Sequence, residues 1–132
     1  MRTFVDTSAL YALLDEDDAQ HQSAVNWLSA SGRDPALILS THNYVVVETA
    51  ALVQRRLGTQ ATRVLFDAFI PAVSVFFVDE LLHRQALSAH LAGGGDVSLV
   101  DRTSFELIRQ LQIAQAFAFD SHFEREGFRT VP

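Results

Sequence analysis

Short apolar runs alternate with amphipathic stretches along this chain of 132 residues, and that alternation limits the folds it can adopt. Short apolar runs rich in β-branched and aromatic residues predict strands, whereas longer stretches with helical periodicity predict helices. Strands and helices that alternate in sequence are typical of α/β domains with a mostly parallel sheet. We therefore expect one α/β domain that covers residues 1–132.

The predicted strands are short, and the strongest is Val73–Val78, which is dense in β-branched and aromatic residues. The full set of predicted strands is Thr3–Asp6, Ala36–Ser40, Val73–Val78, Ala116–Phe119 and Phe128–Val131. Helices are predicted between them, and the third is expected to end at Gly58. The predicted helices are Thr7–Leu14, Asp18–Ser31, about Thr41 to Leu57, Thr59–Phe69, Asp79–Leu91, Ser98–Leu111 and Ser121–Arg125.

Four acidic residues lie beside or inside apolar runs at widely separated positions, and they are Asp6, Glu48, Asp101 and Asp120. Asp6 and Asp120 end predicted strands, and the carboxyl edge of an open α/β sheet is where ligands bind. Asp101 lies in the first turn of a predicted helix, where the helix dipole favours negative charge. Glu48 lies in the middle of a helix, and we expect it to share an inward face with Val45, Ala51 and Leu52.

Burying a single unpaired carboxylate is costly, so four of them require a cation that holds them together. Ligand sets made only of oxygen atoms are those that Mg²⁺ or Mn²⁺ select. The residues therefore predict a metal site assembled from distant parts of one fold. Such a site suits phosphodiester hydrolysis, which needs an activated water and neutralisation of developing negative charge.

Composition excludes several other classes of protein. The chain contains no cysteine, which excludes disulfides, thiolate catalysis and zinc–thiolate sites. A formal net charge of −6 argues against broad affinity for nucleic acid, although a local arginine patch can still hold phosphate. The first residues lack the apolar segment of a signal peptide, and no apolar tract is long enough to span a bilayer. We expect a soluble cytoplasmic protein that does not associate with membranes.

Several short motifs lie in register along nearly the whole chain, and they are Phe4–Leu10, Val47–Thr49, Arg56–Gly58, Ser98–Phe105, Phe119–Glu124 and Gly127–Phe128. Each motif alone is weak, but their order and spacing together are specific. Together they resemble the motifs of the PIN-domain ribonucleases, specifically the toxin subunits of VapBC toxin–antitoxin pairs.

The resemblance implies a three-layer α/β/α fold and a divalent-metal-dependent endoribonuclease. It also implies a homodimer that a small antitoxin neutralises. The family's acidic quartet corresponds here to Asp6, Glu48, Asp101 and Asp120, and none of the four is substituted. The polar position after the first acid corresponds to Thr7 or Ser8, and the Ser/Thr position after the third acid is Ser104.

We assign a role to each of these residues as a hypothesis. Asp6 and Asp101 are expected to ligate Mg²⁺ or Mn²⁺ directly, and Asp120 directly or through water. Glu48 is expected to ligate the metal or to orient the attacking water. Ser104, one helical turn from Asp101, is expected to hydrogen-bond a carboxylate or water of the site. Two further residues, Arg102 and His122, are candidates for contact with an RNA phosphate.

Simpler interpretations compete with these roles. An aspartate at the end of a strand often only caps the next helix, and this applies to Asp6 and Asp120. Asp79 and Asp96 are predicted to be a cap and a turn residue, although Asp96 could lie near the site. A catalytically silent PIN-like module that binds RNA or protein is an alternative function. A phosphatase of the haloacid-dehalogenase kind is disfavoured, because Ser8 replaces its second aspartate and the chain has no lysine.

Overall fold

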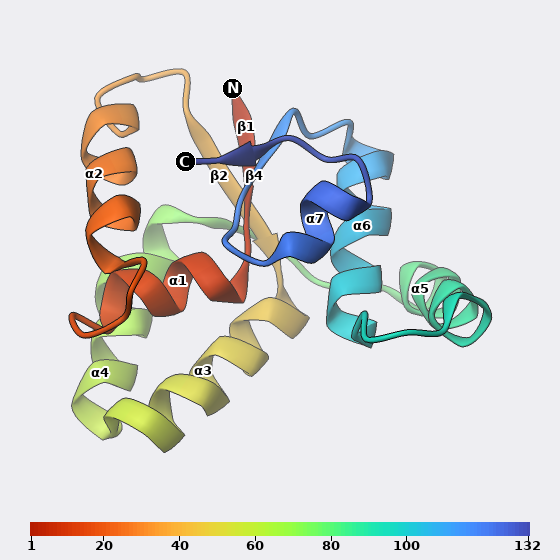
Figure 1. Ribbon diagram of the computed structural model, residues 1–132, viewed down its shortest axis with the longest axis horizontal. Helices are drawn as coiled ribbons and strands as arrows, with labels where there is room; N and C mark the ends of the chain where they lie inside the picture. The colour runs from red at the N-terminus through yellow and green to blue at the C-terminus, as the bar shows by residue number, and fades with distance from the viewer.

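Five short strands form one parallel sheet in the computed structural model, which describes residues 1–132 (Figure 1). The strand order is β3-β2-β1-β4-β5, and Phe4 of β1 lies between Ser40 of β2 and Ala116 of β4. The strands are β1 (Arg2–Val5), β2 (Ile38–His42), β3 (Ser74–Phe76), β4 (Gln115–Phe117) and β5 (Thr130–Val131). The chain builds outward from β1 in one direction and then in the other, so the order reverses between β1 and β4. Crevices at such a switch point bind ligands in α/β folds.

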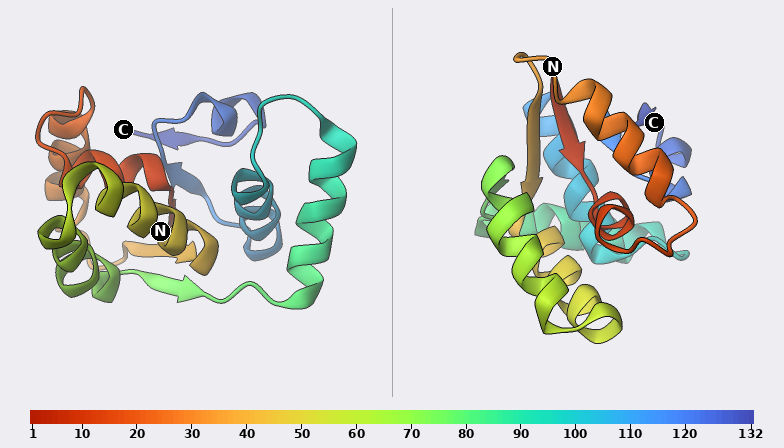
Figure 2. Two further views of the ribbon diagram at one scale, coloured as in Figure 1. Left: turned by 90° about the horizontal axis from the view of Figure 1, so that it is seen from below. Right: turned by 90° about the vertical axis from the view of Figure 1, so that its left-hand side faces the viewer.

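Seven α-helices surround the sheet, and they are α1 (Thr7–Leu14), α2 (His21–Ser31), α3 (Asn43–Leu57), α4 (Thr59–Val64), α5 (Glu80–Gly93), α6 (Leu99–Leu111) and α7 (Ser121–Arg125). The α1–α2 side and the α6–α7 side lie on opposite faces of the sheet (Figure 2). On one face, Trp27 of α2 stacks on Phe117 with ring centroids 4.4 Å apart. On the other, Phe123 of α7 packs on Phe4 at 6.0 Å. The expected three-layer α/β/α architecture is confirmed.

The helices begin at polar residues that follow the strands. Asp6, His42 and Asp120 each accept a hydrogen bond from a backbone N–H in the first turn of the helix that they precede. Asp79 and Ser98 cap α5 and α6 in the same way. These caps satisfy amides that would otherwise lack a partner at the helix start. They also place polar side chains along the carboxyl edge of the sheet.

The core lies against both faces of the sheet and is rich in phenylalanine. Phe4, Phe105, Phe117 and Phe123 are almost completely buried. Phe105 of α6 meets Phe123 edge to face, with centroids 5.1 Å apart. Each such ring contributes roughly 2–3 kcal/mol through its removal from water. This packing holds α6, which carries Asp101, and α7, which Asp120 caps, in a defined position.

Two predicted elements differ from the structure in an informative way. The strongest predicted strand is Val73–Val78, but the corresponding β3 has only three residues and lies at the edge of the sheet. Phe77, which follows β3, is 79% exposed. Strand propensity reports how well side chains fit a pleated surface, not a central position in the sheet. The predicted helix Thr59–Phe69 is regular only to Val64. It continues as a π-helical turn, Leu65–Phe69, and a 3₁₀ turn, Ile70–Ala72, that contains Pro71.

Smaller differences concern the ends of elements. The second helix begins at His21 rather than Asp18, because successive turns occupy the preceding residues. The last strand covers only Thr130–Val131. No helix of the structure combines the length and the apolar character needed to cross a membrane.

Candidate active site

All four predicted acids border one cavity of about 360 Å³ at the carboxyl edge of the sheet. Asp6 follows β1 and Asp120 follows β4, on the two sides of the switch point. Glu48 reaches the cavity from α3, and Asp101 reaches it from the first turn of α6. We call this space the acidic cavity, and it is lined by Asp6, Thr7, Ser8, Glu48, Leu52, Asp96, Ser98, Asp101, Asp120 and His122.

Asp6 is the most deeply buried of these acids, with 3% of its surface exposed. Its Oδ2 accepts hydrogen bonds from the Ser8 backbone N–H at 3.2 Å and from the Ser8 hydroxyl at 2.7 Å. Burial raises the pKa of Asp6 to about 7, although the Ser8 hydrogen bonds oppose this shift and the charges of Asp101 and Asp120 add to it. The carboxylate form of Asp6 is therefore poorly compensated by the protein itself.

Ser8 connects the two strand ends that flank the cavity. Its hydroxyl donates to Asp6 and accepts a hydrogen bond from the Phe119 backbone N–H at 3.0 Å. Thr7 makes a similar link to α3, because its hydroxyl accepts from the Thr49 hydroxyl at 3.1 Å. Thr49 is the residue after Glu48. Both predicted polar residues therefore hold the segments that carry acids, and Ser8 contacts an acid directly.

Asp101, Asp120 and His122 form the tightest group in the cavity. The Nδ1 atom of His122 lies 2.9 Å from Asp120 Oδ1 and 3.2 Å from Asp101 Oδ2. Burial raises the pKa of Asp101, and the nearby charge of Asp120 raises it further. On the other side of the ring, Nε2 lies 3.1 Å from Asp96 Oδ2, and this carboxylate raises the pKa of His122.

These side chains fit a divalent cation. Asp101, Asp120 and His122 can each offer one ligand atom, with all three atoms within 4.8 Å of one another. Carboxylate oxygens dominate the lining, and burial together with mutual repulsion raises the pKa of Asp6 and Asp101. A bound cation would remove that repulsion, which is the reason that such clusters are stable around metals.

Comparison with known proteins identifies the family. The model of the PIN domain matches residues 3–128 of this chain. The chain belongs to the PIN-domain family. A curated relative, the 23S rRNA-specific endonuclease VapC20 of Mycobacterium tuberculosis, is 36% identical over 135 aligned positions that cover 97% of this chain and 96% of the relative. The resemblance inferred from the sequence motifs is confirmed.

Solved structures with a similar fold agree with this assignment. The crystal structure of M. tuberculosis VapC20, described as a sarcin–ricin loop-cleaving toxin, superposes with a TM-score of 0.85 at 35% identity and covers 96% of this chain and 95% of the other. VapBC2 from Rickettsia felis, bound to a promoter DNA fragment, gives 0.68 at 11% identity, with 98% and 97% covered. FitAcB from Neisseria gonorrhoeae gives 0.68 at 17% identity, with 100% and 97% covered. The last two show a shared fold.

Ser104 does not occupy the position that the PIN-domain motif suggested. Its hydroxyl lies 2.9 Å from Nε2 of His42 and donates to the Val100 carbonyl at 3.0 Å. Neither contact involves an acid of the cavity, and Ser104 is absent from the cavity lining. The helical rotation from Asp101 points Ser104 toward β2, where it pairs with a buried histidine. Ser104 therefore makes no hydrogen bond to a site carboxylate in this structure, and its expected bond to a carboxylate or water of the site stays a prediction.

Arg102 is also placed differently from its predicted role in RNA contact. Its side chain is 14% exposed, lies 3.5 Å from Glu126, and contacts the carbonyl of Gly94 at 3.4 Å. A Cβ at Gly93 would lie 2.3 Å from the Arg102 guanidinium, so a side chain there would require Arg102 to move. Arg102 thus fixes the loop before α6. Arg125 is more exposed, at 59%, and lies 3.8 Å from Asp96 of the cavity lining.

Leu52 and Ser98 line the cavity although the sequence did not assign them to the site, and Asp96, predicted as a turn residue that could lie near the site, lines it as well. Leu52 lies one turn after Glu48 on α3, as the shared inward face predicted, whereas Ala51 is exposed. Asp96 follows Gly93–Gly95 and precedes the α6 cap by two residues. An acid on a glycine-rich segment just before a predicted site helix was the available signal.

Proposed function

We propose that this chain is a divalent-metal-dependent endoribonuclease that acts as the toxin of a toxin–antitoxin pair. The observation that carries the proposal is the convergence of Asp6, Glu48, Asp101 and Asp120 on one cavity in a PIN-domain fold. The relative VapC20 is named as a 23S rRNA-specific endonuclease and supports the same class of reaction. A silent binding module would have no need of a cluster whose acids repel one another.

The position of each residue in the acidic cavity suggests its role in the reaction. Asp6, Asp101 and Asp120 would hold Mg²⁺ or Mn²⁺. When bound, such a cation neutralises developing charge and favours formation of a nucleophile from water. Glu48 enters the cavity from α3 and can accept a proton or orient water. Ser8 holds the Asp6 carboxylate in place, and Arg125 lies at the rim, where it can contact a phosphate.

Ribosomal RNA is the substrate class that we propose to test first. VapC20 is described as cleaving the sarcin–ricin loop, and it matches nearly the full length of this chain. A synthetic hairpin of that loop and an unrelated hairpin of equal length form a matched pair. Because the acidic cavity and the net charge of −6 repel phosphate, binding should depend on the cation as well as on local arginine.

The activity can be tested with variants that change a charge but little shape. Purified wild type should cleave the hairpin with Mn²⁺ or Mg²⁺ and stop when EDTA is added. Asp101→Asn should reduce cleavage to background, whereas Asp79→Asn, which changes an exposed helix cap outside the cavity, should leave it unchanged. Cleavage that survives both chelation and Asp101→Asn would show that the acidic cavity is not the catalytic site.

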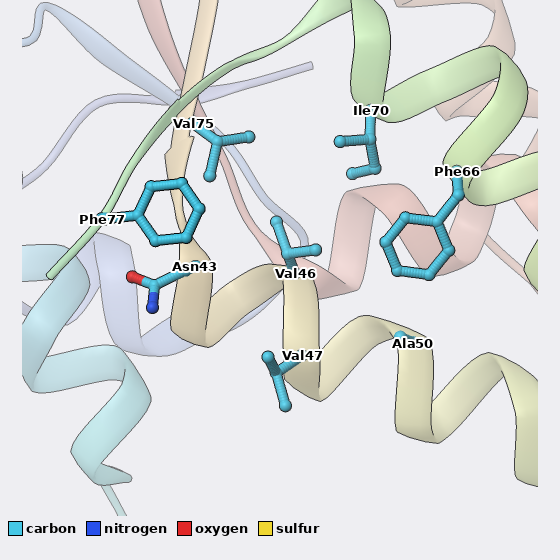
Figure 3. A pocket seen from close by; sticks show the side chains of 8 residues that line it. All are labelled: Asn43, Val46, Val47, Ala50, Phe66, Ile70, Val75 and Phe77. Atoms are coloured by element: carbon cyan, nitrogen blue, oxygen red, sulfur yellow. The ribbon is translucent and has the colours of Figure 1, made fainter.

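A second copy of the chain is proposed to cover an apolar groove beside the edge strand. The groove has a volume of about 590 Å³ and is lined by Asn43, Val46, Val47, Ala50, Phe66, Ile70, Val75 and Phe77. Figure 3 shows side chains from α3, β3 and the turns after α4 around one open space. Val47, Phe66 and Phe77 are 66%, 44% and 79% exposed. A group of large apolar side chains that face water is unusual in a monomer and indicates an interaction surface.

A two-fold dimer would bury the same patch on both copies. Phe77→Asp should therefore convert a dimer to a monomer in sedimentation analysis. Leu91→Asp, at another exposed apolar residue that is absent from the groove lining, is the control. A wild type that sediments as a monomer at all concentrations would contradict this assignment.

The antitoxin is proposed to dock at a separate apolar cavity of about 180 Å³ between α1, α2 and the turns that follow α4. All of its lining residues are apolar, and they include Leu28, Ala68 and Ala72. The small side chains of the two alanines allow the close approach of an amphipathic helix, which would bury its apolar face there. A basic residue beyond that helix could then reach the acidic cavity. Ala68→Glu should prevent co-purification with the antitoxin and leave RNA cleavage intact.

A further inference from the structure

The tightest group of potential metal ligands in this chain contains a nitrogen atom. Asp101, Asp120 and His122 bring their ligand atoms within 4.8 Å of one another, whereas Asp6 and Glu48 line the same cavity outside that group. The acidic quartet expected from the sequence therefore leaves out one potential ligand of this cavity. A histidine lies where a cation held by Asp101 and Asp120 would be coordinated.

His122 is held in this position by the fold. It lies in the first turn of α7, two residues after the Asp120 cap, and its backbone N–H donates to Asp120 Oδ1 at 2.9 Å. Phe123, the next residue, is completely buried against Phe4 and Phe105 and anchors the turn. The His122 side chain is 14% exposed.

Both ring nitrogens of His122 are buried and make no hydrogen bond of acceptable geometry. Nδ1 nevertheless lies 2.9 Å from Asp120 Oδ1 and 3.2 Å from Asp101 Oδ2. A ring nitrogen that lies beside two carboxylate oxygens without a good hydrogen bond can share one cation with them. His42 differs, because it has hydrogen-bond partners on both ring nitrogens.

We propose that His122 is a direct ligand of the cation and makes this chain prefer Mn²⁺ to Mg²⁺. The inference rests on the proposed function only in placing the cation in the acidic cavity. Mg²⁺ selects oxygen ligands and retains much of its water, whereas first-row transition ions accept imidazole nitrogen more readily. Loss of the ring should therefore weaken Mn²⁺ binding far more than Mg²⁺ binding.

A simpler role for His122 is that of a cation that neutralises the carboxylates. The two roles predict opposite outcomes when a metal is added. A ligand nitrogen couples directly to bound Mn²⁺, whereas a protonated ring is repelled by the ion and moves away. Pulsed electron paramagnetic resonance detects the coupling between Mn²⁺ and a ligated nitrogen, and it does so without any measurement of activity.

The experiment uses the metal-free full chain, titrated with Mn²⁺ alone and then with Mg²⁺ as competitor. His122→Asn and His122→Gln remove the imidazole, and His83→Gln removes a histidine that pairs with Tyr44 outside the cavity. Circular dichroism checks that each variant is folded. The wild type and His83→Gln should show nitrogen coupling. Both His122 variants should lose it, with Mn²⁺ affinity reduced about 10-fold or more and Mg²⁺ affinity changed less than about threefold.

Mn²⁺ that binds to the wild type without nitrogen coupling would overturn the inference, as would equal Mn²⁺ affinity in wild type and both His122 variants. An absence of Mn²⁺ binding would overturn it as well. RNA cleavage by the same samples separates this result from the proposed function. Cleavage without nitrogen coupling leaves the nuclease assignment in place, and nitrogen coupling without cleavage removes the nuclease assignment while the ligand inference stands.

Discussion

Two buried polar clusters lie near the carboxyl edge of the same sheet, and they differ in whether their polar atoms have hydrogen-bond partners within the protein. In the first, His42 is completely buried, and its Nδ1 accepts from the Val45 backbone N–H. Its Nε2 therefore carries the proton and donates to Ser104, whose hydroxyl donates to the Val100 carbonyl. In the second, the acids of the acidic cavity face one another, and the only nearby histidine lacks good hydrogen bonds.

The pKa values express this difference. Burial lowers the pKa of His42 to about 4, so the ring is neutral and its hydrogen bonds are complete near neutral pH. Burial raises the pKa of Asp6 to about 7, so the same process leaves a carboxylate that is partly ionised and incompletely stabilised. The neutral, hydrogen-bonded pair of His42 and Ser104 stabilises the fold. The acids of the cavity, which lack such compensation, are suited to binding a cation. The comparison yields four predictions with effects of decreasing size.

Asp101→Asn should have the largest effect, and it should act on function rather than on folding. RNA cleavage should fall by about 10³-fold, a change of about 4 kcal/mol in the barrier. The metal-free variant should be at least as stable as the wild type, because burial and the charge of Asp120 oppose ionisation of Asp101. Mn²⁺ should raise the melting temperature of the wild type through binding linkage but not that of the variant. Strong destabilisation with an unchanged metal response would make Asp101 a structural residue.

The His42 pair should make stability depend on pH. The pKa of His42 falls from 6.5 to about 4 on folding, so between these values the unfolded chain binds a proton that the folded chain does not. Stability should therefore decrease as the pH falls from 6.5 toward 4, with a loss of about 3 kcal/mol from this residue. Urea unfolding above pH 6.5 and near pH 4 measures it, and His42→Gln should show a smaller difference between the two conditions. Equal differences would contradict the prediction.

Ser8→Ala tests a serine that serves the acidic cavity. The change removes a donor from Asp6 and an acceptor from the Phe119 backbone N–H. Because the serine orients a proposed ligand, Mn²⁺ affinity should fall about 10- to 100-fold. Titration followed by electron paramagnetic resonance measures the affinity. Unchanged affinity would restrict Ser8 to a structural role.

Ser104→Ala is the matched change in the satisfied pair and should have the smallest effect. It leaves Nε2 of His42 buried without a partner, which costs about 1–2 kcal/mol in the free energy of unfolding. Mn²⁺ affinity and RNA cleavage below the melting temperature should remain as in the wild type. A loss of cation affinity comparable with that of Ser8→Ala would restore the role in the site that the family motif suggested.

The sequence predicted the fold well wherever the signal was local. The starts of α1 and α7 were predicted correctly because Asp6 and Asp120 cap these helices and an apolar residue follows three positions after each cap. Gly58 ends α3 at a positive φ of 91°, as its position after Leu57 indicated. The four acids could be selected because each interrupts an apolar run. These signals depend on residues that are contiguous in the chain.

Only the tertiary structure decided which side chains meet. Arg102 and Ser104 lie on the helix that carries Asp101, yet one pairs with Glu126 and the other with His42, which is 62 residues away in sequence. The side chains of Asp96 and His122 lie 3.1 Å apart in the cavity lining, although 26 positions separate the two residues in the chain. Helical periodicity determines the direction of a side chain relative to its neighbours on one helix. Which residue that side chain contacts depends on how the helices pack against the sheet. This packing is determined by the whole core, so it cannot be read from one helix.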